Sequence, residues 1–224
     1  MSVSVIIPAY NEASTIGATV RAASRLKGVV EVVVVDDGSH DSTAEEARLA
    51  GARVIRHDDN RGKGQAMMTG LSAAAGDIVL FLDGDLEETA AAAWALVEAV
   101  RGDRCDLAVA AFPRRGTSAG FGLVKRLARL AVRALGKADL TEPLSGQRAI
   151  RRADLEQILP LFDGFGVELA MTIDLLRLGR RVAEIPLPMR HRRTGRDVRG
   201  FIHRARQLAW VLRVIASRCR GGRR

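Results

Sequence analysis

Residues 76–85 read GDIVLFLDGD, an apolar run of strand length from Ile78 to Leu82 that ends in Asp83-Gly84-Asp85. In an open α/β sheet, ligands bind in the crevice beyond the carboxyl ends of the strands, where these two carboxylates would lie. Two carboxylates this close repel each other unless a cation lies between them. Mg²⁺ or Mn²⁺ suits such oxygen ligands, and these ions also bind waters and substrate phosphates. The stretch predicts a metal site at Asp83 and Asp85, the alternative being an acidic turn without a ligand.

The rest of the chain alternates between strand and helix patterns. Besides 78–82, strands are predicted at 3–7, 31–35, 52–55, 105–112 and 182–189, the last at a sheet edge. Helices are predicted around Ile16, Val20 and Ala23, at about 43–50, in the Ala- and Met-rich segment that ends at Gly76, and at about 121–135. Strands joined by helices imply an α/β fold with a doubly wound, mostly parallel sheet and helices on both faces.

Length and composition limit the classes of protein to consider. The 224 residues suffice for one large domain, or for one domain with an appendage. No apolar run reaches 18 residues, and no basic region precedes the first apolar strand, so neither a membrane span nor a signal peptide is expected. Cys105 and Cys219 lack metal-ligand spacing and suggest a reducing cytosol, which predicts a cytoplasmic protein.

The charges are divided unevenly along the chain, whose net charge is +9 at pH 7. Residues 1–98 contain 8 Lys and Arg against 15 Asp and Glu, whereas residues 99–224 contain 27 against 11. The acidic half suits a metal-bearing site, and the basic half needs an anion: nucleic acid, an acidic membrane surface or a phosphorylated acceptor. With one Tyr and two Trp, the chain lacks the stacking platforms of single-strand binders, so we expect no nucleic acid partner.

Four segments of the first 88 residues carry a family resemblance. They are IIPAYNE (6–12), VVDDGS (34–39), NRGKGQA (60–66) and DGD (83–85). Their order resembles that of family 2 glycosyltransferases, which have the GT-A fold and bind a nucleotide diphosphate sugar. The resemblance implies a metal-dependent hexosyltransferase that uses Mg²⁺ or Mn²⁺ and a donor such as UDP-glucose or GDP-mannose.

The resemblance also implies roles for residues of the donor site. Asp37 would accept the N3–H of a uracil, although a turn Asp is the alternative, and Glu12 would bind the ribose hydroxyls unless it only starts a helix. Lys63 would add a cation at the diphosphate, and Asp85 would act in catalysis as well as in metal binding. The other predicted donor-binding residues are Pro8, Ala9, Tyr10, Gly38, Ser39, Asp83 and Gly84.

The second half of the chain resembles two groups of enzymes in this family. Residues 141–149 (TEPLSGQRA) and 164–168 (GFGVE) resemble segments of both polyprenyl-phosphate mannosyltransferases and glucosyl-3-phosphoglycerate synthases. The resemblance implies that Glu142 and Glu168 are catalytic and that His191 is a metal ligand. The alternatives are that Glu142 and Glu168 are structural carboxylates paired with arginines, and that His191 is a surface histidine in a basic stretch. The predicted acceptor-binding residues are Arg114, Arg115, Ser145, Gly146, Arg148 and Arg190.

The sequence departs from both groups, because Glu142 replaces an Asp of the first and a long insertion of the second is missing. The acceptor and the stereochemical outcome, inverting in the first group and retaining in the second, therefore stay open. A polyprenyl phosphate is our first choice of acceptor, and a small phosphorylated acid such as 3-phosphoglycerate is the alternative. A sugar-phosphate nucleotidyltransferase is less well supported, because Pro8-Ala9-Tyr10-Asn11-Glu12 is not the Gly-rich loop of that class.

The predicted organisation is a GT-A domain at 1–198, with a nucleotide-sugar half (1–98) and an acceptor half (99–198), and a basic amphipathic helix with a tail at 199–224. Apolar residues recur in this helix at helical spacing: Phe201, Ala205, Leu208, Val211, Leu212 and Ile215. The helix either docks on the core or lies on anionic lipid, which would make the protein peripheral on the inner face of the membrane. Whether the chain forms a homodimer is left open.

Overall fold

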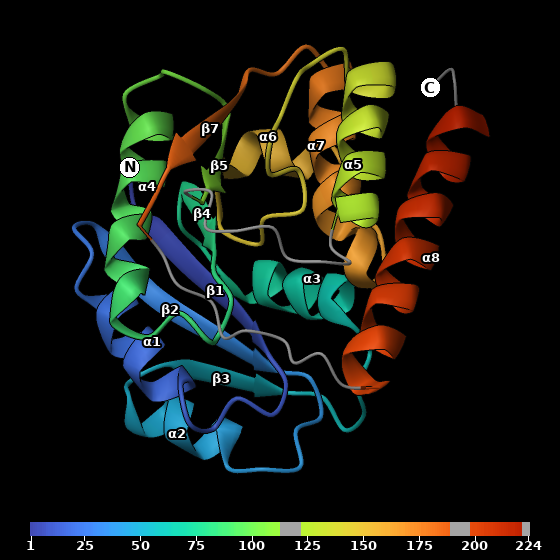
Figure 1. Cartoon of the computed structure of the whole chain (residues 1–224). Helices are drawn as coiled ribbons and strands as arrows, with labels where there is room; N and C mark the ends of the chain where they lie inside the picture. The colour runs from blue at the N-terminus through green and yellow to red at the C-terminus, as the bar shows by residue number, and fades with distance from the viewer. Residues whose placement is uncertain (113–121, 189–197, 221–224) are drawn as a thin grey trace.

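The computed structural model describes residues 1–112, 122–188 and 198–220, the last range by its backbone alone up to residue 205. Seven strands form one sheet in the order β3-β2-β1-β4-β6-β5-β7 (Figure 1). The strands are β1 (Val3–Ala9), β2 (Val29–Asp36), β3 (Arg53–Arg56), β4 (Ile78–Phe81), β5 (Leu107–Ala111), β6 (Arg148–Arg151) and β7 (Val182–Pro186). Only β6 runs antiparallel to its neighbours within this sheet, so the predicted α/β fold with a mostly parallel sheet is confirmed.

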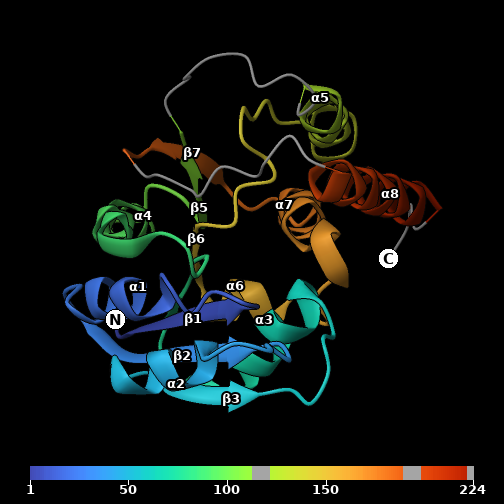
Figure 2. The same cartoon turned by 60° about the horizontal axis from the view of Figure 1, so that its bottom comes forward.

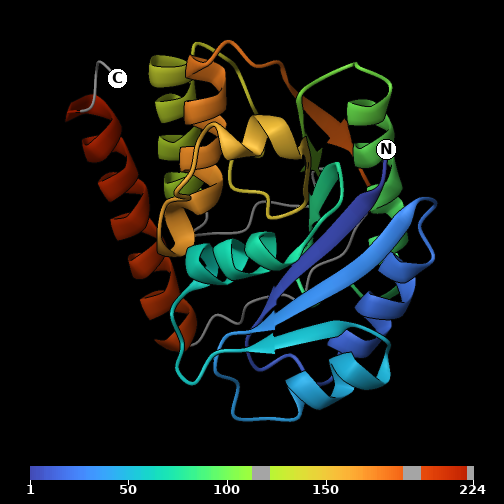
Figure 3. The same ribbon diagram turned by 180° about the vertical axis from the view of Figure 1, so that it is seen from behind.

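Helices cover both faces of the sheet. The α-helices are α1 (Ile16–Ser24), α2 (Thr43–Leu49), α3 (Lys63–Ala73), α4 (Trp94–Arg101), α5 (Gly122–Ala131), α6 (Arg152–Glu156), α7 (Val167–Arg177) and α8 (Val198–Arg220). Short η1 (Glu87–Ala93) and η3 (Gly164–Gly166) are 3₁₀-helices, and η2 (Val132–Gly136) is a π-helical turn that continues α5. Figure 2 shows α1, α2 and α4 on one face of the sheet, and Figure 3 shows α3 across the other.

The alternation of strand side chains explains these two layers. Along β1, Val5 and Ile7 belong to the core cluster shared with α1 and α4, whereas Ile6 belongs to the cluster shared with α3 and α7. Successive residues of a strand point to opposite faces, so a strand that is buried on both faces must be apolar throughout. The continuous apolar runs of the sequence are therefore the central strands of this sheet.

A third cluster joins α5, α7 and α8 beyond the edge of the sheet. It contains buried residues of all three helices, among them Ala128, Ile173 and Val214. In Figure 2, α8 accordingly runs beside α5 and α7. No helix among the described residues is long and apolar enough to cross a membrane.

The predictions missed β6 and the helices α4, α6 and α7. β6 has arginines at both ends, and its first, Arg148, is fully buried. β6 has a single β-branched residue, Ile150, whereas β3, which also has an arginine at each end, has two in a row, Val54 and Ile55. At the edge of the sheet, β7 ends at Pro186, earlier than predicted, and Met189 lies outside the described residues.

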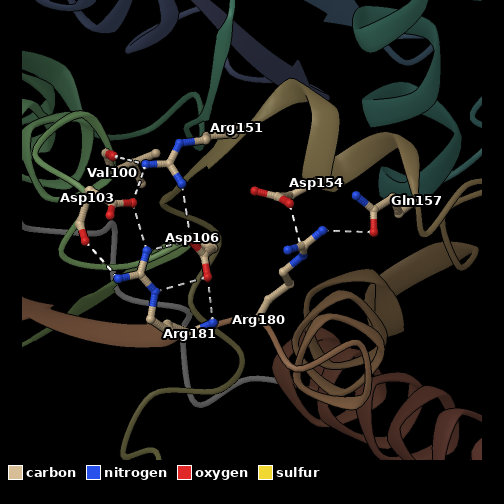
Figure 4. A network of polar contacts seen from close by, with 8 residues as sticks. All are labelled: Val100, Asp103, Asp106, Arg151, Asp154, Gln157, Arg180 and Arg181. Carbon is tan, nitrogen blue, oxygen red and sulfur yellow. Dashed lines mark hydrogen bonds and ion pairs between the residues drawn. The ribbon is translucent and has the colours of Figure 1, made fainter.

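Ion pairs hold the end of the sheet where β5 and β7 begin (Figure 4). Arg181 contacts Asp106 with Nη2 2.8 Å from Oδ1, and Arg151 contacts the same oxygen at 3.1 Å. Asp103 accepts hydrogen bonds from both arginines. The hydrogen bonds that Asp106 accepts from Arg181, followed by the positive charges of Arg181 and Arg151, lower the pKa of Asp106 to about 2. The network therefore ties β5, β6 and β7 together at the end away from the acidic loops.

Candidate active site

A cleft of about 920 Å³ opens where β1, β2 and β4 end. Twelve of the residues predicted from the sequence line it: Pro8, Ala9, Tyr10, Glu12, Asp37, Lys63, Asp83, Asp85, Glu142, Ser145, Gly146 and Glu168. Lining residues that were not predicted include Asn60, Lys125, Gln147, Phe165, Arg206 and Gln207. The parallel strands explain the gathering, because the carboxyl ends of parallel strands meet at one edge.

Three predicted donor residues shape the loops of the cleft. The amide of Asn11 donates to Oγ of Ser39 at 2.9 Å, which joins the loops after β1 and β2. Gly38 has a φ of +76° in the turn after β2, and Gly84 packs against the carboxylate of Glu12. Four other predicted site residues lie outside the described residues: Arg114, Arg115, Arg190 and His191.

Asp37 organises one end of the cleft. Its Oδ1 accepts a hydrogen bond from the amide of Arg61 at 2.9 Å, and its Oδ2 accepts one from the amide of Gly62 at 2.8 Å. Nδ1 of His57 lies 2.7 Å from Oδ1, and Nε2 of the same ring lies 2.9 Å from Oγ1 of Thr69. The buried His57 thus links Asp37 to α3. It was not predicted, because a single histidine after a short strand belongs to none of the four motifs.

Three carboxylates converge beside the loop at 83–85. Burial, followed by the charges of Asp85 and Asp83, raises the pKa of Glu12 to about 8. Oε2 of Glu12 is buried and has no hydrogen-bond partner in the part of the chain that the structure describes. An excess of carboxylate oxygens around an unsatisfied buried oxygen suits a divalent cation.

Asp83 and Asp85, the pair predicted from the sequence, therefore have the chemistry that Mg²⁺ or Mn²⁺ needs. No group of three His, Cys, Asp or Glu side chains within the described ranges is arranged to hold a metal unaided. Mg²⁺ usually binds through one or two carboxylates, waters and substrate phosphates, so two aspartates are enough.

Lys63 lies between two of the acidic residues at the first turn of α3. Its Nζ is 2.7 Å from Oδ1 of Asp83 and 2.7 Å from Oε1 of Glu168. Although burial alone would lower the pKa of Lys63, these two carboxylates raise it above its ordinary value. On its other side, Oδ2 of Asp83 accepts a hydrogen bond from Nε2 of Gln147 at 2.6 Å. A Cβ at Gly146 would lie 2.7 Å from Nζ of Lys63 and 2.6 Å from Oδ1 of Asp83, so a side chain there would displace this ion pair.

The family model for glycosyl transferase family 2 matches residues 4–159, which include all the motifs of the first half of the chain. The chain belongs to this family. It is therefore a glycosyltransferase, and its mixed sheet has the GT-A arrangement of the solved relatives.

Similar proteins and structures agree with this assignment. The glycosyltransferase is 34% identical over 245 residues to a glucosyl-3-phosphoglycerate synthase of Mycobacterium tuberculosis, covering 97% of this chain and 74% of the relative. It is 30% identical over 204 residues to a dolichol-phosphate mannosyltransferase of Pyrococcus furiosus, covering 83% and 56%. A crystal structure of the M. tuberculosis synthase with Mn²⁺, UDP and phosphoglyceric acid has a TM-score of 0.82 at 31% identity, covering 97% of this chain and 78% of that one.

The structure corrects one acceptor-binding residue of the glycosyltransferase. Arg148 was predicted to contact the acceptor, but its side chain is 0% exposed and is absent from the cleft lining. Its guanidinium donates to carbonyl oxygens of Ser145, Glu168 and Pro143 at 2.7–2.8 Å. Arg148 thus holds the 143–145 loop against α7, and its role is structural.

The remaining acceptor-side residues lie around the other end of the cleft. Glu142 forms an ion pair with Lys125 of α5, and Ser145 is buried in the same loop. The structure adds residues of α8, since Arg206 and Gln207 line the cleft together with the buried Val211. Their amphipathic pattern alone did not reveal this, because it fits a docked helix and a lipid-bound helix equally well.

Proposed function

We propose that this glycosyltransferase transfers glucose from UDP-glucose to a small phosphorylated acceptor of the 3-phosphoglycerate type, using Mg²⁺ or Mn²⁺. The observation that carries the proposal is one cleft whose lining brings Asp37, Lys63 and the two aspartates together with acceptor-side residues, among them Lys125, Glu142 and Arg206. The relatives that align with almost the whole chain are glucosyl-3-phosphoglycerate synthases, and a solved one holds UDP, Mn²⁺ and phosphoglyceric acid. The alternative acceptor of the sequence analysis thus has more support than its first choice.

On the donor side, each residue has a chemical task. Asp37, held by His57 and by the amides of Arg61 and Gly62, presents its remaining lone pair to the N3–H of the uracil. Glu12 lines the cleft with its carboxylate against Gly84, where it can accept hydrogen bonds from the ribose hydroxyls. Lys63 brings a positive charge to the diphosphate, and Gly62 lets the backbone come close to it. Gly64, predicted to do the same, instead packs against the backbone at 162–164, where a Cβ would lie 2.2 Å from the carbonyl oxygen of Phe162.

Asp83 and Asp85 would hold the divalent cation. When bound, it neutralises charge on the departing nucleoside diphosphate. Around it, Lys63 and Gln147 keep Asp83 oriented through both of its oxygens.

On the acceptor side, Glu142 and Glu168 accept hydrogen bonds from the acceptor hydroxyls and orient the attacking oxygen toward the anomeric carbon. Each carboxylate is already fixed by a lysine, Glu142 by Lys125 and Glu168 by Lys63. Fixed groups of this kind hold reactants in a reactive geometry at little entropic cost during the reaction.

A polyprenyl phosphate has weaker support, although the mannosyltransferase relative speaks for it. A membrane acceptor requires the protein at the bilayer surface, and α8 was the candidate for that contact. Val211 and Val214 of this helix are buried, and Leu208 and Ile215 pack against the same cluster. Of the apolar residues with described side chains in the predicted stripe, Leu212 alone is strongly exposed, at 50%.

The proposal is tested by pairing donors with acceptors. UDP-glucose and GDP-mannose are incubated with Mn²⁺ and 3-phosphoglycerate, glycerol 3-phosphate or a polyprenyl phosphate in detergent, and products are identified by mass spectrometry. We expect a glucosylated phosphorylated acid from UDP-glucose. Transfer to the polyprenyl phosphate alone, or from GDP-mannose alone, would contradict the proposal.

A further inference from the structure

We propose that α8 forms the wall of the cleft that binds the anionic group of the acceptor, with Arg206 as the cation and Gln207 as its hydrogen-bonding neighbour. The inference rests on the proposed function and names residues for its acceptor side. Neither residue belongs to a motif of the sequence analysis, and both line the cleft.

The balance of charge in the cleft points to Arg206. Among the described residues, three cationic side chains line the cleft: Lys63, Lys125 and Arg206. Lys63 is paired with two carboxylates and Lys125 with one. No ion pair joins Arg206 to a carboxylate within those residues. Within the described part of the cleft, Arg206 is therefore the cation that no carboxylate neutralises, and its guanidinium can bind an incoming phosphate or carboxylate with two parallel hydrogen bonds.

Gln207 supplies an independent sign of a missing ligand. Its Oε1 is buried and has no hydrogen-bond partner among the residues that the structure describes. Buried polar atoms of native proteins nearly always have a partner, and those without one need an explanation. A hydroxyl of a bound acceptor would donate to this oxygen, while the amide N–H groups of Gln207 could donate to its carboxylate or phosphate.

The helix that carries both residues is firmly held. Trp210, one turn after Arg206, packs edge-on against Phe162, with ring centroids 6.2 Å apart, and a Cβ at Gly164 would lie 2.5 Å from its ring. Further along, Nε of Arg218 lies 2.9 Å from Oδ1 of Asp174 in α7. Binding groups on a fixed helix are positioned more accurately than groups on loops.

The same contacts place this wall next to the donor side. A Cβ at Gly62 would lie 3.6 Å from Cα of Gly164, the residue on which Trp210 packs. The residue after Gly62 is Lys63, which contacts Asp83. An acceptor held by Arg206 and Gln207 would therefore lie next to the donor diphosphate.

Binding and kinetics of matched variants test the inference. Protein saturated with UDP and Mg²⁺ is titrated by calorimetry with 3-phosphoglycerate and, separately, with geranyl phosphate as a soluble polyprenyl phosphate. We expect Arg206→Ala to weaken binding of 3-phosphoglycerate at least tenfold and Arg206→Lys to weaken it less. Gln207→Glu, which adds a negative charge at nearly constant shape, should weaken it more than Gln207→Ala. UDP affinity should stay within twofold in all four variants.

The control is Arg220→Ala, which removes an exposed arginine at the end of the same helix and outside the cleft lining. Unchanged 3-phosphoglycerate binding in Arg206→Ala, or an equal loss in Arg220→Ala, would overturn the inference. So would a native protein that binds neither probe. If geranyl phosphate binds instead and Arg206→Ala weakens it, the assignment of α8 stands and the proposed phosphoglycerate-type acceptor is wrong.

Discussion

Nζ of Lys63 lies 2.7 Å from Oδ1 of Asp83, so the cation of the first turn of α3 directly neutralises the first aspartate of the Asp-Gly-Asp motif. The same Nζ lies 2.7 Å from Oε1 of Glu168. In the proposed reaction Lys63 brings its positive charge to the donor diphosphate.

Replacing Lys63 by Met should therefore weaken UDP-glucose binding. A hydrogen bond to a charged group contributes about 1.5–3 kcal/mol, so we expect a loss of about tenfold or more in UDP affinity by calorimetry. Lys27→Met is the matched control, because Lys27 is exposed and does not line the cleft. Equal UDP affinity of Lys63→Met and the native protein would refute this role.

Removing the metal, or its second aspartate, should stop transfer. Bound divalent ions contribute several kcal/mol to such transition states, and each 1.4 kcal/mol or so is tenfold in rate. Asp85→Ala should therefore lower kcat about a hundredfold or more, and EDTA should abolish activity until Mn²⁺ is added back. Glu88→Ala, an exposed carboxylate three residues away, should keep native activity. Full turnover in the presence of EDTA would refute this prediction.

His57→Ala should affect stability and donor binding together, because His57 is buried and bridges Asp37 and Thr69. A buried group that loses its partner costs about 1–3 kcal/mol, which we expect as the fall in the free energy of unfolding in urea. UDP affinity should fall as well, because Asp37 loses one of the contacts that orient it. Thr69→Val removes the outer hydrogen bond alone and should have a smaller effect on UDP. A His57→Ala protein that binds UDP normally would show that the bridge is only structural.

The network around Asp106 predicts a specific pH dependence of stability. Its carboxylate has a pKa of about 2 in the folded protein, against 3.8 ordinarily, because Arg181 and Arg151 stabilise the charged form. A lowered folded-state pKa adds stability that is fully present above the unfolded value and is lost as the pH falls through the folded value. The native protein should thus lose this contribution between about pH 4 and pH 2.

Asp106→Asn should remove the stabilising contribution of the Asp106 charge at every pH. After allowance for solvent screening at the half-exposed Arg181, we expect about 1–2 kcal/mol at pH 7, measured as the free energy of unfolding. The difference from the native protein should shrink toward pH 2. Asp139→Asn, at an exposed position, serves as the control. A difference that stays constant down to pH 2 would mean that packing, and not charge, explains the effect.

The donor side of this site could be predicted from the sequence, because its residues follow apolar strands directly. Asp37 and Asp83 were located by the ends of β2 and β4, and those strands are evident from continuous apolar runs. Arg148 could not be interpreted in this way. Its burial depends on carbonyl groups from residues 143, 145 and 168, which only the folded chain brings together.

The docking of α8 on the core could not be predicted from the sequence either. A stripe of apolar residues predicts that one face of a helix is covered, but the pattern does not say whether protein or lipid covers it. Trp210 and Arg218 decide the matter through partners far away in the sequence, Phe162 and Asp174. Long-range contacts of this kind leave no local signal.

The docked helix predicts how the protein behaves toward membranes. Because Val211 and Val214 are buried against α5 and α7, the apolar face of α8 is not available to enter lipid. We expect the full-length protein to stay in the supernatant when it is sedimented with anionic liposomes at physiological salt. If the protein sediments with the liposomes and added salt prevents this, α8 lies on the membrane surface. A polyprenyl phosphate would then be the better candidate for the acceptor.

Two substitutions in α8 test the same packing from the side of stability. Val214→Ala removes buried methyl groups and leaves a cavity, which should lower the free energy of unfolding by about 1.5–3 kcal/mol. Leu212→Ala truncates a side chain that is 50% exposed, so its effect should stay within about 0.5 kcal/mol. An equal and small effect of both on urea unfolding would mean that α8 does not dock on the core.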